Sequence, residues 1–150
     1  MIASGQLARL EEVARGCGSV LDVGGWYRPF NLATHVLDLC PYDTRRRHDA
    51  LDPHDAERFS ADTWTIRDIC DTPWPYADRQ FDFAFCSHTL EDVRDPVAVC
   101  RELARVARAG YVEVPSRARE IFVKKRLSRL RGLLGRASEV GFRHHRWFCE

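Results

Sequence analysis

The sequence lacks any hydrophobic run that approaches the ~20 residues a membrane-spanning helix needs. Its six cysteines include no C-x-x-C pair, which excludes the spacing of zinc ribbons and thioredoxin-like redox motifs. No large charge excess is present either, because the formal net charge is +1 over 150 residues. With 45% hydrophobic and 30% charged residues, the composition is that of an ordinary soluble domain. We therefore expect one domain over residues 1–150, with its cysteines reduced.

The N-terminal stretch MIASGQLARLEEVARG carries Glu11 and Glu12 where a signal peptide needs its apolar centre. Its pattern predicts an amphipathic helix that ends at Gly16. We expect a cytoplasmic protein on this basis.

Short apolar runs alternate with polar or helical stretches along the chain. Strands are predicted at 19–25, 35–41, 63–70, 81–88 and 111–115, and the clearest helix at 95–110, ended by Gly110. About ten residues separate the first two strands, which leaves room for a helix of one or two turns. Strands that are apolar on both faces indicate an α/β fold, Rossmann-like, with a mostly parallel sheet and helices on both faces.

Residues that could contact a ligand end four of these stretches, each after the apolar run. They are Asp22, Gly24 and Gly25 in the first, Asp38 in the second, Asp68 and then Ile69 in the third, and Ser87 and His88 in the fourth. In a parallel sheet such positions meet at one edge, where ligands bind. Glycines allow close approach of a ligand, and an acid after the second strand suits a ribose diol. The crevice therefore suits an adenosine-containing ligand, whereas a nicotinamide cofactor is disfavoured because G-x-G-x-x-G is absent.

The stretches VLDVGGWYRPFNLATHVLDLCPY and IRDICDTPWPYADRQFDFAFCSHTLEDVRDPVAVCRELARVARAGYVEVPS resemble, in order, the motifs of class I S-adenosylmethionine-dependent methyltransferases. The resemblance covers roughly residues 18–116 and implies S-adenosylmethionine as cofactor. It implies that Asp22, Gly24 and Gly25 form the floor under the methionine part, Asp38 holds the ribose, Asp68 and Ile69 take the adenine, and Ser87 and His88 close the methionine side. The implied activity is methyl transfer to a small-molecule or glycan- or lipid-linked acceptor.

Two positions depart from the family pattern. The third glycine after the first strand is missing, and the bulky Trp26 and Tyr27 follow instead. The family's L-E-H is L-E-D here, with Asp92 at the last position. His88 is then the first candidate for a proton acceptor or an acceptor contact, although capping of a helix explains it equally well. For Glu91 and Asp92 the favoured role is stabilisation of the first turn of a helix.

The C-terminal segment is basic. Residues 117–150 carry ten Lys or Arg and three acids, a net +7, which leaves −6 on residues 1–116. A basic insertion or tail at 117–141 is expected, and 117–136 has an amphipathic pattern. Such a helix packs on its own sheet or contacts an anionic surface.

In GFRHHRWF, we expect a sixth strand that turns His144 or His145 toward the substrate. Because neighbours on a strand point to opposite faces, no metal site is expected there. The family continues through a sixth and a seventh strand, so the C-terminal strands are predicted to be short or missing. An unpaired sheet edge would favour a homodimer.

Two other classes of function stay open. One is a non-catalytic methyltransferase-like binding protein, suggested by the missing glycine and the short C-terminus. The other is a nucleic-acid-binding or nucleic-acid-modifying protein that uses the basic tail. This second class is disfavoured because the body is acidic and the tail interleaves few aromatic residues with its charges.

Overall fold

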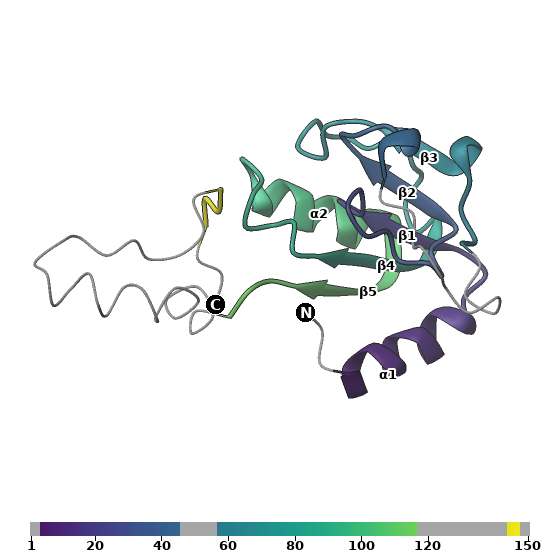
Figure 1. The fold of residues 1–150 in the computed structure, drawn as a ribbon. Coiled ribbons are helices and arrows are strands. Elements are labelled where there is room, and N and C mark those ends of the chain that lie inside the picture. Colours follow the sequence, from purple (N-terminus) through teal and green to yellow (C-terminus); the bar gives the residue numbers. More distant parts are fainter. Residues whose placement is uncertain (1–3, 46–56, 117–143, 148–150) are drawn as a thin grey trace, which may run out of the picture.

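A computed structural model of the chain describes residues 4–45, 57–116 and 144–147. The elements in chain order are α1 (Ser4–Arg15), β1 (Val20–Val23), β2 (His35–Asp38), η1 (Tyr42–Thr44), η3 (Ala61–Thr63), β3 (Trp64–Ile66), β4 (Phe81–Ser87), α2 (Pro96–Val106) and β5 (Ala107–Glu113) (Figure 1). The predicted strands are all present, each shorter than or shifted from its predicted range. The basic stretches 117–141 and 117–136 lie outside the described residues.

The five strands form one sheet in the order β3-β2-β1-β4-β5, and every neighbouring pair is parallel. Asp22 of β1 is in register with Val36 of β2 and with Phe85 of β4. The strand order reverses between β1 and β4, so the topological switch point lies at the carboxyl ends of these two strands. The predicted Rossmann-like α/β fold is confirmed.

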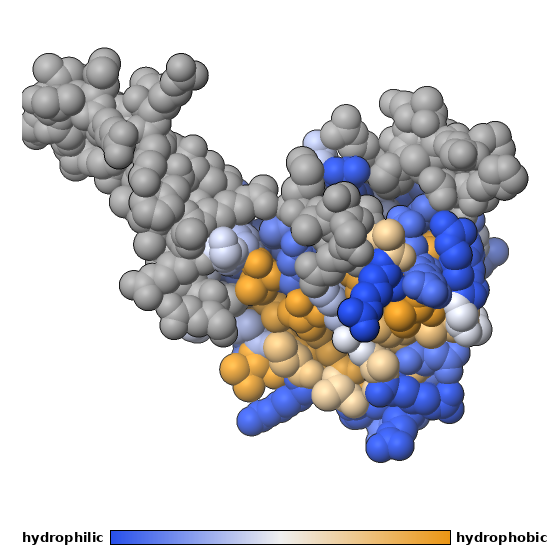
Figure 2. All heavy atoms as spheres, turned by 90° about the horizontal axis from the view of Figure 1, so that it is seen from below, coloured by the Kyte–Doolittle hydropathy of each residue, from blue (hydrophilic) through white to orange (hydrophobic). Residues whose placement is uncertain are grey.

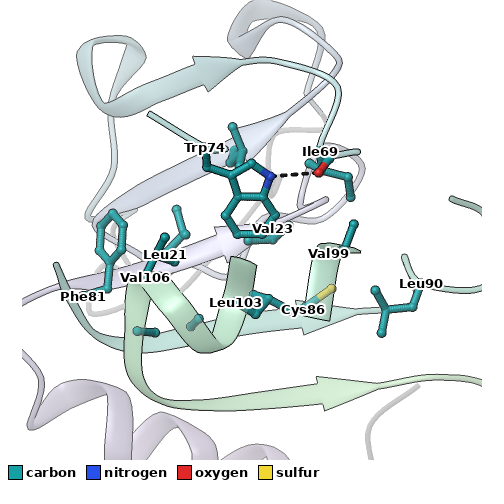
Figure 3. Packing of buried hydrophobic residues seen from close by; sticks show 13 residues of the cluster. Leu21, Val23, Ile69, Trp74, Phe81, Cys86, Leu90, Val99, Leu103 and Val106 are labelled. Atoms are coloured by element: carbon teal, nitrogen blue, oxygen red, sulfur yellow. Dashed lines mark hydrogen bonds between the residues drawn. The ribbon is translucent and has the colours of Figure 1, made fainter. Parts of the chain in front are cut away.

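The two helices lie on opposite faces of the sheet (Figure 1). The α2 face holds a buried cluster that includes Leu103, Val106 and Trp74 (Figure 3). On the other face, Leu10 and Ala14 of α1 join a cluster rich in aromatic side chains. Burial of both faces explains why β1 and β2 are nearly all apolar.

Helix α2 begins as its sequence predicts, because the Asp95 side chain caps it by accepting from the Ala98 N–H at 2.9 Å. The predicted end at Gly110 is wrong, since the helix ends at Val106 and Gly110 lies within β5. There it packs so closely on β4 that a Cβ would lie 3.0 Å from the Ala84 carbonyl oxygen. The glycine signal marked a close strand contact rather than a helix terminus.

The predicted short helix between β1 and β2 is also wrong. Residues 24–34 form turns and irregular backbone. Two N–H groups of this segment, those of Trp26 and Phe30, donate to the buried carboxylates of Asp38 and Asp22. These bonds hold the segment in an irregular path instead of a helix.

Strand β5 is the last strand of the described sheet, and much of it is exposed. Figure 2, which views the molecule from the side of α1 and β5, shows hydrophobic residues gathered in a patch bordered by hydrophilic ones. Val13 of α1 and Val112 of β5 are among the exposed large hydrophobic residues. The homodimer stays a prediction. In the described part of the chain, no helix has the length and apolar character to cross a membrane.

Candidate active site

A cavity of 620 Å³ lies at the carboxyl ends of the strands. Five of the predicted site residues line it: Gly24, Asp38, Asp68, Ile69 and His88. Asp22, Gly25 and Ser87 are not among its lining residues. A volume of this size is within the range of small-ligand sites. The residues predicted from the strand ends therefore lie at one edge of the sheet, but only some of them line the cavity.

Asp22 is buried beneath the loop that follows β1. Its Oδ2 accepts a hydrogen bond of 2.7 Å from the Phe30 N–H, and burial raises its pKa to about 7. Gly25 lies directly against this carboxylate, since a Cβ there would be 2.1 Å from Asp22 Oδ2. These two residues support the wall of the cavity from behind.

Gly24 forms part of the wall itself. Its φ of +77° is in the left-handed region, and a Cβ would lie 2.3 Å from the Thr89 side chain. Its N–H donates to the Leu37 carbonyl at 2.9 Å, which ties the loop to β2. The lack of a side chain at Gly24 therefore lets the loop after β1 pack closely on Thr89, which also lines the cavity.

Asp38 ends β2 with its carboxylate at the cavity. Its Oδ2 accepts from the Trp26 N–H at 3.0 Å, and its Oδ1 accepts from the Cys40 N–H at 2.7 Å. Burial raises the pKa of Asp38, while these N–H groups act to lower it. The two bonds fix the carboxylate and leave its remaining lone pairs for a ligand. The Trp26 ring is turned toward η1, where its Nε1–H donates to Thr44 Oγ1 at 2.9 Å.

Asp68 follows β3 and is held from two sides. Its Oδ1 accepts from the Cys70 N–H at 2.8 Å, and its Oδ2 pairs with Arg94, which also pairs with Asp71. The Cys70 N–H and the Arg94 guanidinium hold the pKa of Asp68 below its usual value. The carboxylate is therefore ionised at neutral pH.

Ile69, next to Asp68, is fixed by the core. The Trp74 indole N–H donates to the Ile69 carbonyl at 2.8 Å, as the dashed line in Figure 3 marks. Trp74 is 2% exposed and packs among residues of the α2 face. The core thus positions the loop that carries both predicted adenine contacts.

His88 lies between two carboxylates. Its Nδ1 is 3.4 Å from Glu91 Oε1, and its Nε2 is 3.7 Å from Glu113 Oε1. Its φ of 53° is in the left-handed region, which is unusual for a residue with a side chain. Ser87, the other predicted residue here, donates its hydroxyl to Glu113 Oε2 at 2.9 Å. Ser87 thus positions Glu113 instead of lining the cavity.

Glu91 and Asp92 do not begin a helix, contrary to the sequence prediction. They lie in a turn, and α2 starts only at Pro96. Glu91 is 1% exposed, and its Oε2 has no hydrogen-bond partner among the described residues. A buried acid beside an imidazole is an arrangement typical of proton-transfer sites.

His144 and His145 lie beside Asp92, in a turn and irregular backbone rather than the expected strand. Their rings are in contact, with centroids 4.5 Å apart and planes at 90°. The inference that they point to opposite faces is wrong because it assumed a strand. Their predicted role as substrate contacts stays a prediction.

Several site residues were not found from the sequence. Glu113 ends β5 and would have followed from the same strand-end rule that found the others. Arg94 and Arg146 also line the cavity, but a single arginine in a turn carries no local signal. Trp26 and Tyr27, seen only as departures from a pattern, form part of the wall.

The chemistry of this edge fits an adenosine-containing cofactor. A fixed carboxylate ends β2, an apolar side chain follows β3, and a loop without side-chain bulk at Gly24 follows β1. The fold and the cavity together place the candidate ligand site at the switch point of a parallel α/β sheet.

Comparison with known proteins gives the family. The family model described as a methyltransferase domain matches residues 13–112, and the chain belongs to that family. It is a class I S-adenosylmethionine-dependent methyltransferase, as its motifs indicated. No curated protein matches the sequence.

A similar fold occurs in the crystal structure of an S-adenosylmethionine-dependent methyltransferase from Thermotoga maritima, a possible histamine N-methyltransferase. The identity is 18%, the TM-score is 0.50, and the match covers 96% of this chain and 70% of that one. At this identity the likeness shows the fold alone.

Proposed function

We propose that the chain binds S-adenosylmethionine in the cavity at the carboxyl ends of β1 to β4 and transfers a methyl group to a small-molecule or glycan- or lipid-linked acceptor. The observation that carries the proposal is the convergence of Gly24, Asp38, Ile69 and His88 on one cavity at the switch point. The family match supports the same activity.

The cofactor end of the site is the β2–β3 side. The Asp38 carboxylate, fixed by two backbone N–H groups, accepts hydrogen bonds from the ribose hydroxyls. The Asp68 carboxylate accepts from the exocyclic amine, and Ile69 packs on the adenine ring. Gly24, which has no side chain and lines the cavity, offers its backbone to the ligand.

The acceptor end is the β4–β5 side. When bound, the cofactor supplies an electrophilic methyl group on its sulfonium. His88 takes the proton from the acceptor's nucleophile, and the carboxylates of Glu91 and Glu113 orient the ring and stabilise the resulting imidazolium. Alignment of the two ligands within one cavity supplies much of the rate.

An acceptor screen tests the proposed transfer. Panels of small hydroxyl and amine compounds, sugars and polyprenyl-linked sugars are incubated with the protein and cofactor, and S-adenosylhomocysteine is quantified. With an active acceptor, the kcat of the His88→Ala variant should be about 10²–10⁴-fold lower than that of the wild type, because general-base catalysis has that magnitude. The affinity of the variant for the cofactor should be unchanged. A matched control is His35→Ala in β2, outside the cavity lining. Equal activity of wild type and His88→Ala would refute the role of His88.

The same experiment distinguishes a methyltransferase from a non-catalytic binding protein. A folded chain that binds the cofactor but forms no S-adenosylhomocysteine with any acceptor class would support a binding protein instead.

A further inference from the structure

The C-terminal described segment, residues 144–147, is fastened to the turn that precedes α2. The N–H groups of Arg146 and Trp147 donate to the Glu91 carbonyl at 2.6 and 3.2 Å. The Trp147 indole N–H donates to the Val93 carbonyl at 2.7 Å. These bonds join positions more than fifty residues apart and hold two imidazoles beside Asp92, a residue of the cavity wall.

The segment places His144 and His145 beside Asp92, which itself lines the cavity. One ligand atom from each of the three residues lies within 4.8 Å of the others. His145 Nε2 is 4.0 Å from Asp92 Oδ1. Around a tetrahedral zinc ion, ligand atoms are about 3.3 Å apart, as follows from metal–ligand bonds of about 2.0–2.1 Å. Side-chain rotations close the difference, because Asp92 and His144 are exposed.

We infer that Asp92, His144 and His145 bind a divalent transition-metal ion of the zinc class at the acceptor end of the cavity. Two imidazole nitrogens and one carboxylate oxygen are the donor set that such ions prefer over calcium or magnesium. Three protein ligands leave at least one position open for water or substrate, which is the arrangement of catalytic rather than structural sites.

A metal at this position would change the acceptor chemistry, an extension that rests on the proposed function. One carboxylate leaves a bound divalent ion with a net positive charge, and Arg146 lines the same cavity. A positively charged acceptor end of the cavity favours a methyl acceptor that reacts through a hydroxyl oxygen, because a hydroxyl bound to the ion would lose its proton more easily. His88, which lines the same cavity as Asp92, would be the base for that proton. Binding of the ion itself does not require the cofactor.

The test is calorimetric titration of the full chain with Zn²⁺ in the absence of cofactor. We expect one ion per chain with micromolar affinity, and at least a tenfold loss of affinity in Asp92→Asn, His144→Ala and His145→Ala. Cys100→Ser removes an exposed thiol of α2 and should leave binding unchanged. Circular dichroism confirms that each variant is folded.

Zinc binding that is absent, or that is equal in the wild type and the three variants, would overturn the inference. Binding lost in Cys100→Ser but kept in the histidine variants would overturn it also, because the ion would then sit on a thiolate. Because no cofactor is present, these results are independent of whether S-adenosylmethionine binds. Cofactor binding without zinc binding would leave the proposed function intact and refute the metal site.

Discussion

Gly25 lies against the carboxylate of Asp22 so closely that a Cβ would be 2.1 Å from the Asp22 Oδ2 atom. This contact joins the loop after β1 to the only buried acid within that strand. The contact explains why residue 25 is a glycine although it does not line the ligand cavity.

Gly25→Ala should therefore destabilise the protein by about 1–3 kcal/mol, the usual cost of overpacking a filled interior. Gly18→Ala is the matched control, because its Cβ would lie 3.4 Å from Asp82 Oδ2, an ordinary contact. Urea unfolding of both variants measures the difference. Equal midpoints would show that the loop shifts freely and that the contact is unimportant.

The raised pKa of Asp22 predicts a pH dependence of stability. Its pKa is 3.8 in the unfolded chain and about 7 when buried, so the folded state holds the proton over this interval. The contribution of Asp22 to the free energy of unfolding is therefore greatest below pH 3.8 and falls as the pH rises toward 7. Above pH 7 it no longer changes with pH. The steepest slope for one proton is about 1.4 kcal/mol per pH unit.

Asp22→Asn keeps an oxygen for the Phe30 N–H and removes the titration. The free energy of unfolding of the variant, measured by urea titration from pH 4 to pH 8, should lack this slope. The stability of the variant relative to the wild type should therefore increase as the pH rises. Parallel curves for the two proteins would contradict the assignment.

Arg94 bridges Asp68 and Asp71 at the adenine end of the cavity. Arg94→Gln should change stability little, because exposed ion pairs contribute little in water. Cofactor affinity should fall a few-fold, since Asp68 loses its guanidinium partner and keeps its contacts with Cys70. Arg101→Gln, on the exposed side of α2, is the control. Unchanged affinity in Arg94→Gln would show that the pairing does not position Asp68.

The parallel sheet and its ligand edge could be predicted because both depend on local patterns. Short apolar runs identify buried strands, and the rule that parallel strands end at one edge then places Asp38, Asp68 and His88 together. The rule does not say which of two adjacent residues faces the cavity. Asp22 and Ser87 follow it and yet point their side chains to other protein groups.

What could not be predicted depends on contacts between distant positions. The segment between β1 and β2 is irregular because Asp22 and Asp38 receive the N–H groups of Phe30 and Trp26, across 8 and 12 residues. The Asp68–Arg94 pair spans 26 residues, and the contact of Trp147 with Val93 spans 54. None of these pairings leaves a periodic signal in the sequence.

The proposed function depends most on the binding of the cofactor by Asp38 at the switch point. Calorimetric titration with S-adenosylmethionine and S-adenosylhomocysteine tests it in wild type, Asp38→Ala and the control Asp62→Ala, which removes an exposed acid of η3. Thermal unfolding of each variant shows that it is folded. We expect micromolar binding in wild type and Asp62→Ala. We expect affinity to fall about tenfold to a hundredfold in Asp38→Ala, the value of hydrogen bonds to a charged group. Equal affinity in all three folded proteins, or no binding by any of them, would contradict the proposed cofactor site.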